Sequence, residues 1–290
     1  MARLEVRKTY KLYVGGAFPR SESGRSYPVT DAEGNFVANV AQGSRKDVRD
    51  AVRAARSAVA GWSGTSAFNR GQVLYRVAEI MEGRRAQFTA EVAAAEGLSP
   101  DQAGDVVDAA IDRWVWYAGW SDKIAQVAGS ANPVAGPYLN LSVPEPTGVV
   151  GVLAPQASSL LGLVSVIAPA IVTGNAVVVV TSQERPVPAV TLAECLATSD
   201  VPGGVVNLVT GHTSELASHL ASHADVNALD LVGSPAEELV PLQVLAADTL
   251  KRVLAPPVGA GSEPEWTASP GLDRLLAFLE TKTVWHTKGL

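Results

Sequence analysis

The sequence predicts an α/β fold in which a doubly wound parallel sheet follows a group of N-terminal helices. Four apolar runs, "GVVGVLA", "AVVVV", "GVVNLV" and "ALDLVG", succeed one another after residue 147, and helical segments separate them. Runs that are apolar throughout are typical of strands buried on both faces. Because helices connect them, we expect parallel strands with helices on both sides, a Rossmann-like arrangement. A hairpin and a C-terminal strand are expected beside it.

Composition narrows the class of protein. The 290 residues are 47% hydrophobic and 18% charged, with a formal net charge of −6, and they suffice for one large domain. Lys and Arg form no stripe, so nucleic acid is not an expected partner. The longest apolar runs, such as 160–173, are shorter than the ~18 residues of a membrane span, and no membrane contact is expected. The start lacks the apolar core of a signal peptide, and Cys195 is the single cysteine, so we expect a cytoplasmic protein without disulfides.

The N-terminal part begins with short strands and turns over 11–40 and continues as helices. Ser44 is a predicted helix cap, because an acidic residue follows three positions later and apolar residues then recur on one face. Further helices are expected at about 68–84 and 86–95. Ser99 caps a long helix whose first position is a proline.

The pattern changes at two later places. Residues 136–146 alternate in polarity until prolines interrupt them, which predicts a hairpin-like excursion from the first domain, 1–254. Residues 255–271 are rich in Pro and Gly without periodicity and are predicted to be a linker. Residues 272–290 then form one short helix and one strand. A lone strand needs a sheet edge, which either this chain or a neighbour supplies.

A doubly wound sheet binds ligands at the carboxyl ends of its strands. No GxGxxG motif is present, and "GVVGVLAP" is a weak signal alone. Backbone amides at helix starts there can hold phosphate, and ordinary turns explain the same residues equally well. The candidate positions are Pro155–Ser159, Thr181–Gln183, Gly211 and Gly233–Ser234.

The residues that carry chemistry in other proteins have simpler interpretations here. Cys195 lies in mid-helix without a cationic neighbour in the sequence, so we expect a buried, structural thiol. His219 and His223 are four residues apart but lack an HExxH core, which favours a solvated helix face over a metal site. The tryptophans at 114, 116 and 120 are expected in the core or an interface. We predict no catalytic and no metal-binding residue.

A longer pattern resembles the aldehyde dehydrogenase family, collinearly over about residues 10–254. The matching segments are "GWSGTSAFNRGQVLYRVAEIMEGRRAQFTAEVAAAEG", "WYAGWSDKIAQVAG", "YLNLSVPEPTGVVGVLAP", "APAIVTGNAVVV", "PGGVVNLVTG", "DVNALDLVGS" and "LKRV". The resemblance implies aldehyde substrates, NAD(P) as cofactor, and a fold with a dinucleotide-binding domain, a catalytic domain and oligomerisation strands.

The sequence differs from the family at the positions of the family's catalytic and cofactor-binding residues. Ala157 stands where the family has an Asn that donates to the oxyanion, and alanine has no such donor. Val180 replaces a Lys that holds the adenosine ribose, and Gln183 replaces an acidic residue. The general base Glu falls on Pro256, and no cysteine follows Cys195 to supply the nucleophile.

The resemblance therefore implies a chain that lacks the family's catalytic domain and keeps both of its oligomerisation pieces. The chain is short by about the size of a catalytic domain, on the order of 200 residues, and "ETKTV" resembles the family's terminal strand. We expect a non-catalytic subunit that assembles with a full-length aldehyde dehydrogenase, or with itself, through 136–146 and 281–286. A functional NAD(P)-dependent oxidoreductase and a nucleotide-binding sensor are the alternatives. Any NAD or NADP binding is expected to be weak or absent, with these remaining contacts: Pro155, Ser182, Gly211, Gly233 and Ser234.

Overall fold

The structure, a computed structural model, describes residues 8–256 and 263–288. A short antiparallel pair of strands precedes a run of helices, as the sequence predicts. Ser44 caps the first helix in a capping box with Asp47, and Ser99 caps the fourth in the same way with Gln102. The elements are β1 (Ser26–Thr30), β2 (Phe36–Ala41), α1 (Arg45–Gly64), α2 (Ala67–Glu82), α3 (Arg85–Glu96), α4 (Pro100–Trp120) and α5 (Ile124–Ala128).

The centre of the molecule is a five-stranded parallel sheet in the order β7-β6-β5-β8-β9, which confirms the predicted fold class. The chain winds from β5 to β7 on one side and then returns to place β8 and β9 on the other. The strands are β5 (Val149–Leu153), β6 (Ala176–Val180), β7 (Val206–Val209), β8 (Ala228–Asp230) and β9 (Arg252–Leu254), and the helices between them are α6 (Leu161–Val172), α7 (Val187–Leu196), α8 (Thr213–Ser222) and α9 (Ala236–Ala247).

Alternate residues of the strands pack into two separate hydrophobic cores. Val177 and Val179 pack into a core with α2, α4 and α6, whereas Val178 and Val180 pack into one with α1 and α8. All four side chains are fully buried. Both faces of the sheet are therefore covered, which explains why its strands are apolar throughout.

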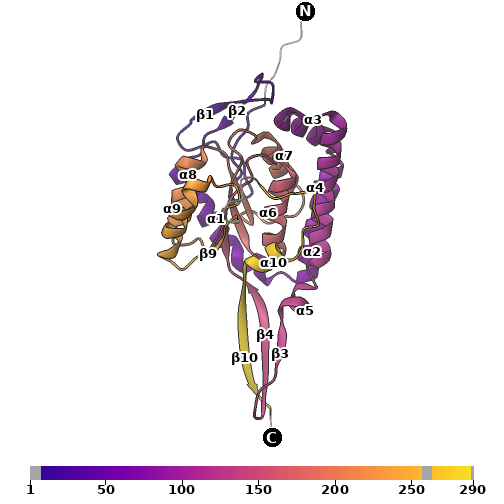
Figure 1. Cartoon of the computed structure of the whole chain (residues 1–290), viewed down its shortest axis with the longest axis vertical. Coiled ribbons are helices and arrows are strands. Elements are labelled where there is room, and N and C mark those ends of the chain that lie inside the picture. The colour runs from indigo at the N-terminus through magenta and orange to yellow at the C-terminus, as the bar shows by residue number, and fades with distance from the viewer. Residues whose placement is uncertain (1–7, 257–262, 289–290) are drawn as a thin grey trace, which may run out of the picture.

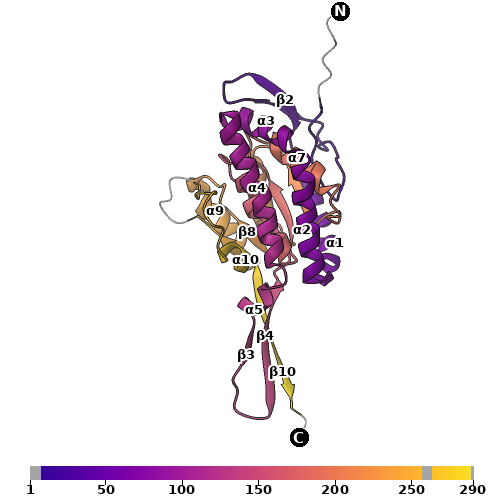
Figure 2. The same ribbon diagram turned by 90° about the vertical axis from the view of Figure 1, so that its right-hand side faces the viewer.

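A second, three-stranded antiparallel sheet projects from one end of the body (Figures 1 and 2). It has the order β10-β4-β3, from β3 (Ser130–Asn132), β4 (Tyr138–Pro146) and β10 (Leu279–Thr287). The C-terminal strand thus finds its sheet edge within this chain: Leu279 pairs with Pro146 and Thr287 with Tyr138. None of the helices in the described part of the chain is long and apolar enough to cross a membrane.

The stretch predicted to be a linker differs from that expectation in the part the structure describes, 263–271. Trp266 is only 9% exposed and joins the core on the α4 side of the sheet. Arg113 of α4 donates to the carbonyl of Trp266 at 2.6 Å and to that of Ala268 at 3.1 Å. The first half of the stretch, 257–262, lies outside the described residues. The segment 263–271 is therefore anchored to the domain through Trp266, although most of its residues are exposed.

The short helix α10 (Asp273–Ala277) continues this packing toward β10. Leu275 and Phe278 are each 1% exposed. The guanidinium of Arg274 forms an ion pair with the fully buried carboxylate of Asp230, at the end of β8. It also lies 5.3 Å from the ring of Trp266. Trp266, Leu275 and Phe278 thus cover apolar surface of the core that α4 and α6 share.

Candidate functional site

The carboxyl ends of β5 and β8 mark the point where the strand order reverses, which is where doubly wound sheets bind ligands. The loop after β5 presents its backbone N–H groups there. Those of Gln156, Ala157 and Ser158 all donate to the carboxylate of Glu263, with distances of 2.7 Å from Ala157 and 3.3 Å from Ser158. The indole of Trp266 donates to the same carboxylate at 3.1 Å. Successive amides of this kind form an anion-binding nest, and Glu263 supplies the anion.

The rest of the loop is equally engaged. The N–H and the hydroxyl of Ser159 both donate to Glu96, at the end of α3, at 2.6 Å. The side chain of Gln156 donates to the carbonyl of Ala154 at 2.7 Å and accepts from the N–H of Gln183 at 3.0 Å. Four consecutive amides, from 156 to 159, thus have carboxylate partners from this chain.

The five residues proposed as cofactor contacts do not form one cluster. Pro155, Ser182 and Gly233 lie near the loop, whereas Gly211 lies against Gly43. Ser182 is buried, accepts from the N–H of Arg185 and donates to the carbonyl of Gln156 at 3.1 Å. Its hydrogen bonds are therefore used within the protein.

The two glycines are explained by packing. A Cβ at Gly233 would lie 1.8 Å from the carbonyl oxygen of Ala154, so only glycine allows the turn after β8 to approach the residue after β5 this closely. Gly211 has a φ of +152°, and a Cβ there would lie 3.2 Å from the backbone nitrogen of Gly43. Ser234 follows Gly233, and its hydroxyl donates to the carbonyl of Pro235 at 3.2 Å.

The cavity at this edge of the sheet has a volume of about 280 Å³. Two carboxylates, those of Glu184 and Glu238, line it, and among its described lining residues there is no Lys or Arg. The first turn of α9 carries Glu237 and Glu238, which already complement the positive end of the helix. A dinucleotide diphosphate would meet negative charge here, so these residues do not fit that group. The lining residues are Gln156, Gln183, Glu184, Thr213, Ser214, Gly233, Pro235 and Glu238.

The other positions of interest carry no reactive group at this edge. The side chain of Val180 is fully buried in β6. Cys195 is also fully buried, on α7, and its sulfur lies 3.9 Å from Nη1 of Arg84. Burial raises the pKa of the Cys195 thiol to about 11, so the thiolate is scarce at neutral pH. Trp114 is fully buried, as expected for a core aromatic.

The histidine pair also lacks the features of a metal site. His223 lies at the end of α8, where its Nδ1 accepts from the N–H of Asp225 at 3.1 Å. Across residues 8–256 and 263–288, no group of three or more His, Cys, Asp or Glu side chains is arranged to hold a metal ion.

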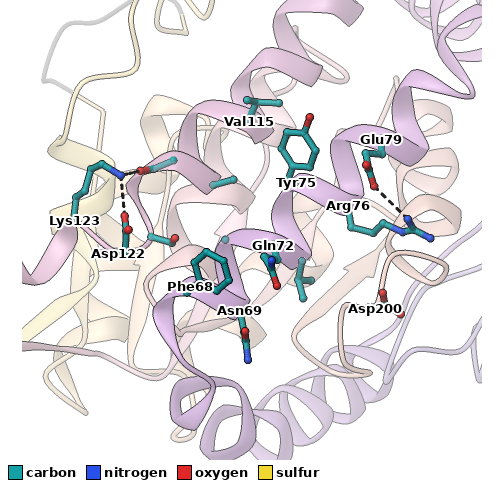
Figure 3. Close-up of a pocket in the computed structure, with 15 residues that line it drawn as sticks. Phe68, Asn69, Gln72, Tyr75, Arg76, Glu79, Val115, Asp122, Lys123 and Asp200 are labelled. Carbon is teal, nitrogen blue, oxygen red and sulfur yellow. Dashed lines mark hydrogen bonds and ion pairs between the residues drawn. The ribbon is translucent and has the colours of Figure 1, made fainter.

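A larger groove lies elsewhere, between α2 and α4, with a volume of about 900 Å³ (Figure 3). Four of its charged side chains form two ion pairs, Arg76 with Glu79 at 3.3 Å and Lys123 with Asp122 at 2.8 Å, and Asp200 also lines it. Phe68, Tyr75 and Val115 supply the apolar part of the groove. Such a paired and open lining offers a contact surface more than a site for chemistry.

Sequence reasoning missed the residues that decide the character of the sheet edge. Glu263 lies in a stretch without periodicity, and Glu96 lies 63 residues from Ser159. A carboxylate beside a tryptophan in an otherwise Pro- and Gly-rich segment, "SEPEW", was the only available signal that this segment is anchored.

Comparisons with known proteins agree with the fold and the sequence motifs. Residues 18–256 match the aldehyde dehydrogenase family. The mitochondrial benzaldehyde dehydrogenase of Antirrhinum majus is 31% identical over 84% of this chain and 46% of its own length. The human retinal dehydrogenase 2 is 32% identical over 86% and 48%. The chain thus spans about half the length of these curated relatives.

Solved structures give the same picture. A putative aldehyde dehydrogenase from Burkholderia cenocepacia superposes with a TM-score of 0.80 at 30% identity, over 84% of this chain and 51% of that one. An aldehyde dehydrogenase from Bacillus cereus, solved as an NAD+ complex, gives 0.80 at 25% identity, over 86% and 50%. The chain therefore belongs to the aldehyde dehydrogenase family.

Proposed function

We propose that this chain is a non-catalytic subunit that assembles with a complete aldehyde dehydrogenase, or with further copies of itself. The observation that carries the proposal is the projecting sheet, which exposes a continuous apolar row. Leu139, Leu141 and Val143 alternate along β4, so they share one face, and they are 44%, 36% and 40% exposed. Contiguous exposed apolar side chains of this kind mark interaction surfaces.

The strand beside this row adds to it. Val284 of β10 pairs with Leu141 and lies on the same face. The nine-residue strand β10 is an edge strand, since β4 is its only neighbour in the described sheet. A long open edge can accept a strand from a second chain. The sheet thus offers a partner both an apolar face and backbone hydrogen-bonding groups.

A second apolar surface lies on α9. Val240 and Val244 are one helical turn apart and 66% and 64% exposed. The two surfaces lie on different parts of the fold, which suits a subunit contacted by more than one neighbour.

The sheet edge supports the non-catalytic part of the proposal. Ala157 carries no donor for an oxyanion, and the single cysteine is buried away from this edge with a raised pKa. Loss of one oxyanion donor costs ~100–1000-fold in rate, and loss of the nucleophile removes the covalent route altogether. The alternative of an NAD(P)-dependent oxidoreductase predicts NADH formation from aldehydes by the isolated chain.

The nucleotide-sensor alternative draws only on the family relationship, because the cavity at the sheet edge is acidic. It predicts micromolar affinity for NAD or NADP by calorimetry. A cytoplasmic location, expected from the sequence, is part of our proposal.

The proposal is tested by replacing one side chain in the apolar row. Leu141→Lys places a charge at the centre of the row, and Val37→Lys, at a side chain 39% exposed on β2, is the matched control. We expect the tagged wild type and the Val37→Lys variant to co-purify with a complete aldehyde dehydrogenase or with untagged copies of the chain. Leu141→Lys should lose that partner. Equal recovery with both variants, or no such partner for the wild type, would reject the proposal.

A further inference from the structure

We propose that a cavity beside the β1–β2 pair binds a small, multiply charged oxyanion such as a diphosphate or a tricarboxylate. The cavity has a volume of about 350 Å³. Its described lining residues all fall within 8–41 and are therefore distinct from those at the edge of the parallel sheet. Four cationic side chains line it, and none of its described lining residues is an Asp or Glu. The lining thus carries a local excess of positive charge in a chain whose net charge is −6. The four cations are Lys8, Lys11, Arg20 and Arg25.

Two of these cations are available to a ligand. In the part of the chain that the structure describes, neither Lys11 nor Arg20 forms an ion pair or a side-chain hydrogen bond. Lys8 pairs with Glu194 at 2.5 Å, and Arg25 pairs with Glu215 at the long distance of 3.7 Å. An anion that enters the cavity can pair with Lys11 and Arg20 without first breaking an ion pair.

The backbone that carries the cations is tied to the domain. The N–H of Ala41 donates to the carbonyl of Tyr10 at 3.0 Å, between Lys8 and Lys11. The N–H of Leu12 donates to the carbonyl of Pro19 at 3.1 Å, next to Lys11 and Arg20. The N–H of Gln42 donates to the carbonyl of Arg25 at 3.0 Å. These hydrogen bonds hold the backbone from which the cationic side chains extend, so less conformational entropy is lost when a ligand binds.

Neutral polar groups complete the lining. Thr9, Ser21 and Ser26 contribute hydroxyls, and Asn39 contributes an amide. The carboxylate of Asp47 lies behind Ser21, but Ser21, Glu22 and Ser44 all donate to it. Its charge is therefore compensated by three donors. Because the hydroxyl proton of Ser21 is used on Asp47, the neutral donors left for a ligand are the hydroxyls of Thr9 and Ser26 and the amide of Asn39.

The size of the cavity selects the class of ligand. A volume of about 350 Å³ is at the lower end of small-molecule sites, which suits an anion with few heavy atoms. Arg and Lys together bind phosphate and carboxylate oxygens, so both chemistries fit, and titration separates them. The site is independent of the assembly proposed above.

The test is calorimetric titration of the full chain with inorganic pyrophosphate and, separately, with citrate at low ionic strength. We expect at least one anion to bind with micromolar affinity, and binding to weaken as salt is added because exposed charges are screened. The Lys11→Gln/Arg20→Gln variant should lose at least tenfold in affinity. Preference for one anion identifies a phosphorylated or a carboxylate ligand.

The control removes the same charge elsewhere. Arg53→Gln/Lys288→Gln changes two exposed cations outside the cavity and should leave the affinity unchanged. Melting curves establish that both variants are folded. The inference is overturned if neither anion binds the wild type, or if the two double variants lose affinity equally.

Discussion

The carboxylate of Glu263 accepts a hydrogen bond of 2.7 Å from the backbone N–H of Ala157, across 106 residues of sequence. By the resemblance, the family has an oxyanion-binding Asn at the position of Ala157. In this chain the N–H groups of the same loop bind the carboxylate of Glu263. Glu263 thus links the returning segment 263–271 to the edge of the sheet. The loop serves as an anchor for the chain that follows it.

Replacing Glu263 should loosen this anchor. Glu263→Ala leaves the N–H groups of Gln156, Ala157 and Ser158 to water, and we expect a loss of about 1–2 kcal/mol in the free energy of unfolding. Urea denaturation measures it. Glu265→Ala is the control, because the carboxylate of Glu265 accepts, within the described residues, only from Thr267 two residues away, and it should cost less than about 0.5 kcal/mol. Equal effects would contradict the anchoring role.

Breaking the ion pair of Asp230 and Arg274 should cost more stability than replacing Glu263. Arg274→Ala leaves a fully buried carboxylate without its cation, which typically costs about 3–5 kcal/mol. The Asp230→Asn/Arg274→Leu double variant removes both charges and should be closer to the wild type. Denaturation of the two variants, with amide exchange in β10, tests this. A double variant as unstable as Arg274→Ala would show that the lone charge is not the cause.

The stability of the Arg274→Ala variant should depend on pH in a defined direction. Burial raises the pKa of Asp230 above its ordinary value of 3.8, and Arg274 opposes that rise. Because the pKa of Asp230 is higher in the folded chain than in the unfolded one, the contribution of Asp230 to the free energy of unfolding is greatest below pH 3.8. It is lost as the pH rises through the pKa of the folded state. Removing Arg274 should enlarge the rise in pKa, so Arg274→Ala should be less destabilised at pH 4 than at pH 7. A destabilisation that does not vary with pH would refute this.

Cys195 should behave as a structural thiol. Because burial raises its pKa to about 11, alkylation by iodoacetamide should be slow at neutral pH in the folded protein and fast in denaturant. Raising the pH toward 11 should accelerate the reaction of the folded chain as thiolate forms. Rapid modification at pH 7 without unfolding would show a reactive nucleophile and would weaken the non-catalytic proposal.

NAD should not stabilise the isolated chain. If the dissociation constant exceeds 1 mM, 1 mM NAD adds less than about 0.4 kcal/mol to the free energy of unfolding. The Glu184→Gln/Glu238→Gln variant removes the two carboxylates of the cavity and should bind NAD better than the wild type. Thermal denaturation with and without NAD measures both. Strong stabilisation of the wild type would favour the nucleotide sensor.

Local patterns predicted the elements of this fold well. The capping box of Ser44 and Asp47 lies within four residues, so the sequence shows it directly, and the apolar strands reveal burial on both faces of the sheet. The long-range contacts were not predictable. Glu263 reaches Ala157, and Arg274 reaches Asp230, only because the chain returns along the sheet, and no periodicity encodes such a return. The candidate cofactor contacts were proposed from their place at the carboxyl ends of the strands and from the family resemblance, and close packing explains one of them, Gly233.

The most direct test of the central claim is the native mass of the assembly that contains this chain in its own cells. Native mass spectrometry of the affinity-purified protein should show a complex larger than the 30.1 kDa chain. Its other subunits should be a complete aldehyde dehydrogenase, or copies of this chain, in a fixed ratio. A single species of 30.1 kDa that forms NADH from aldehydes by itself would contradict the account.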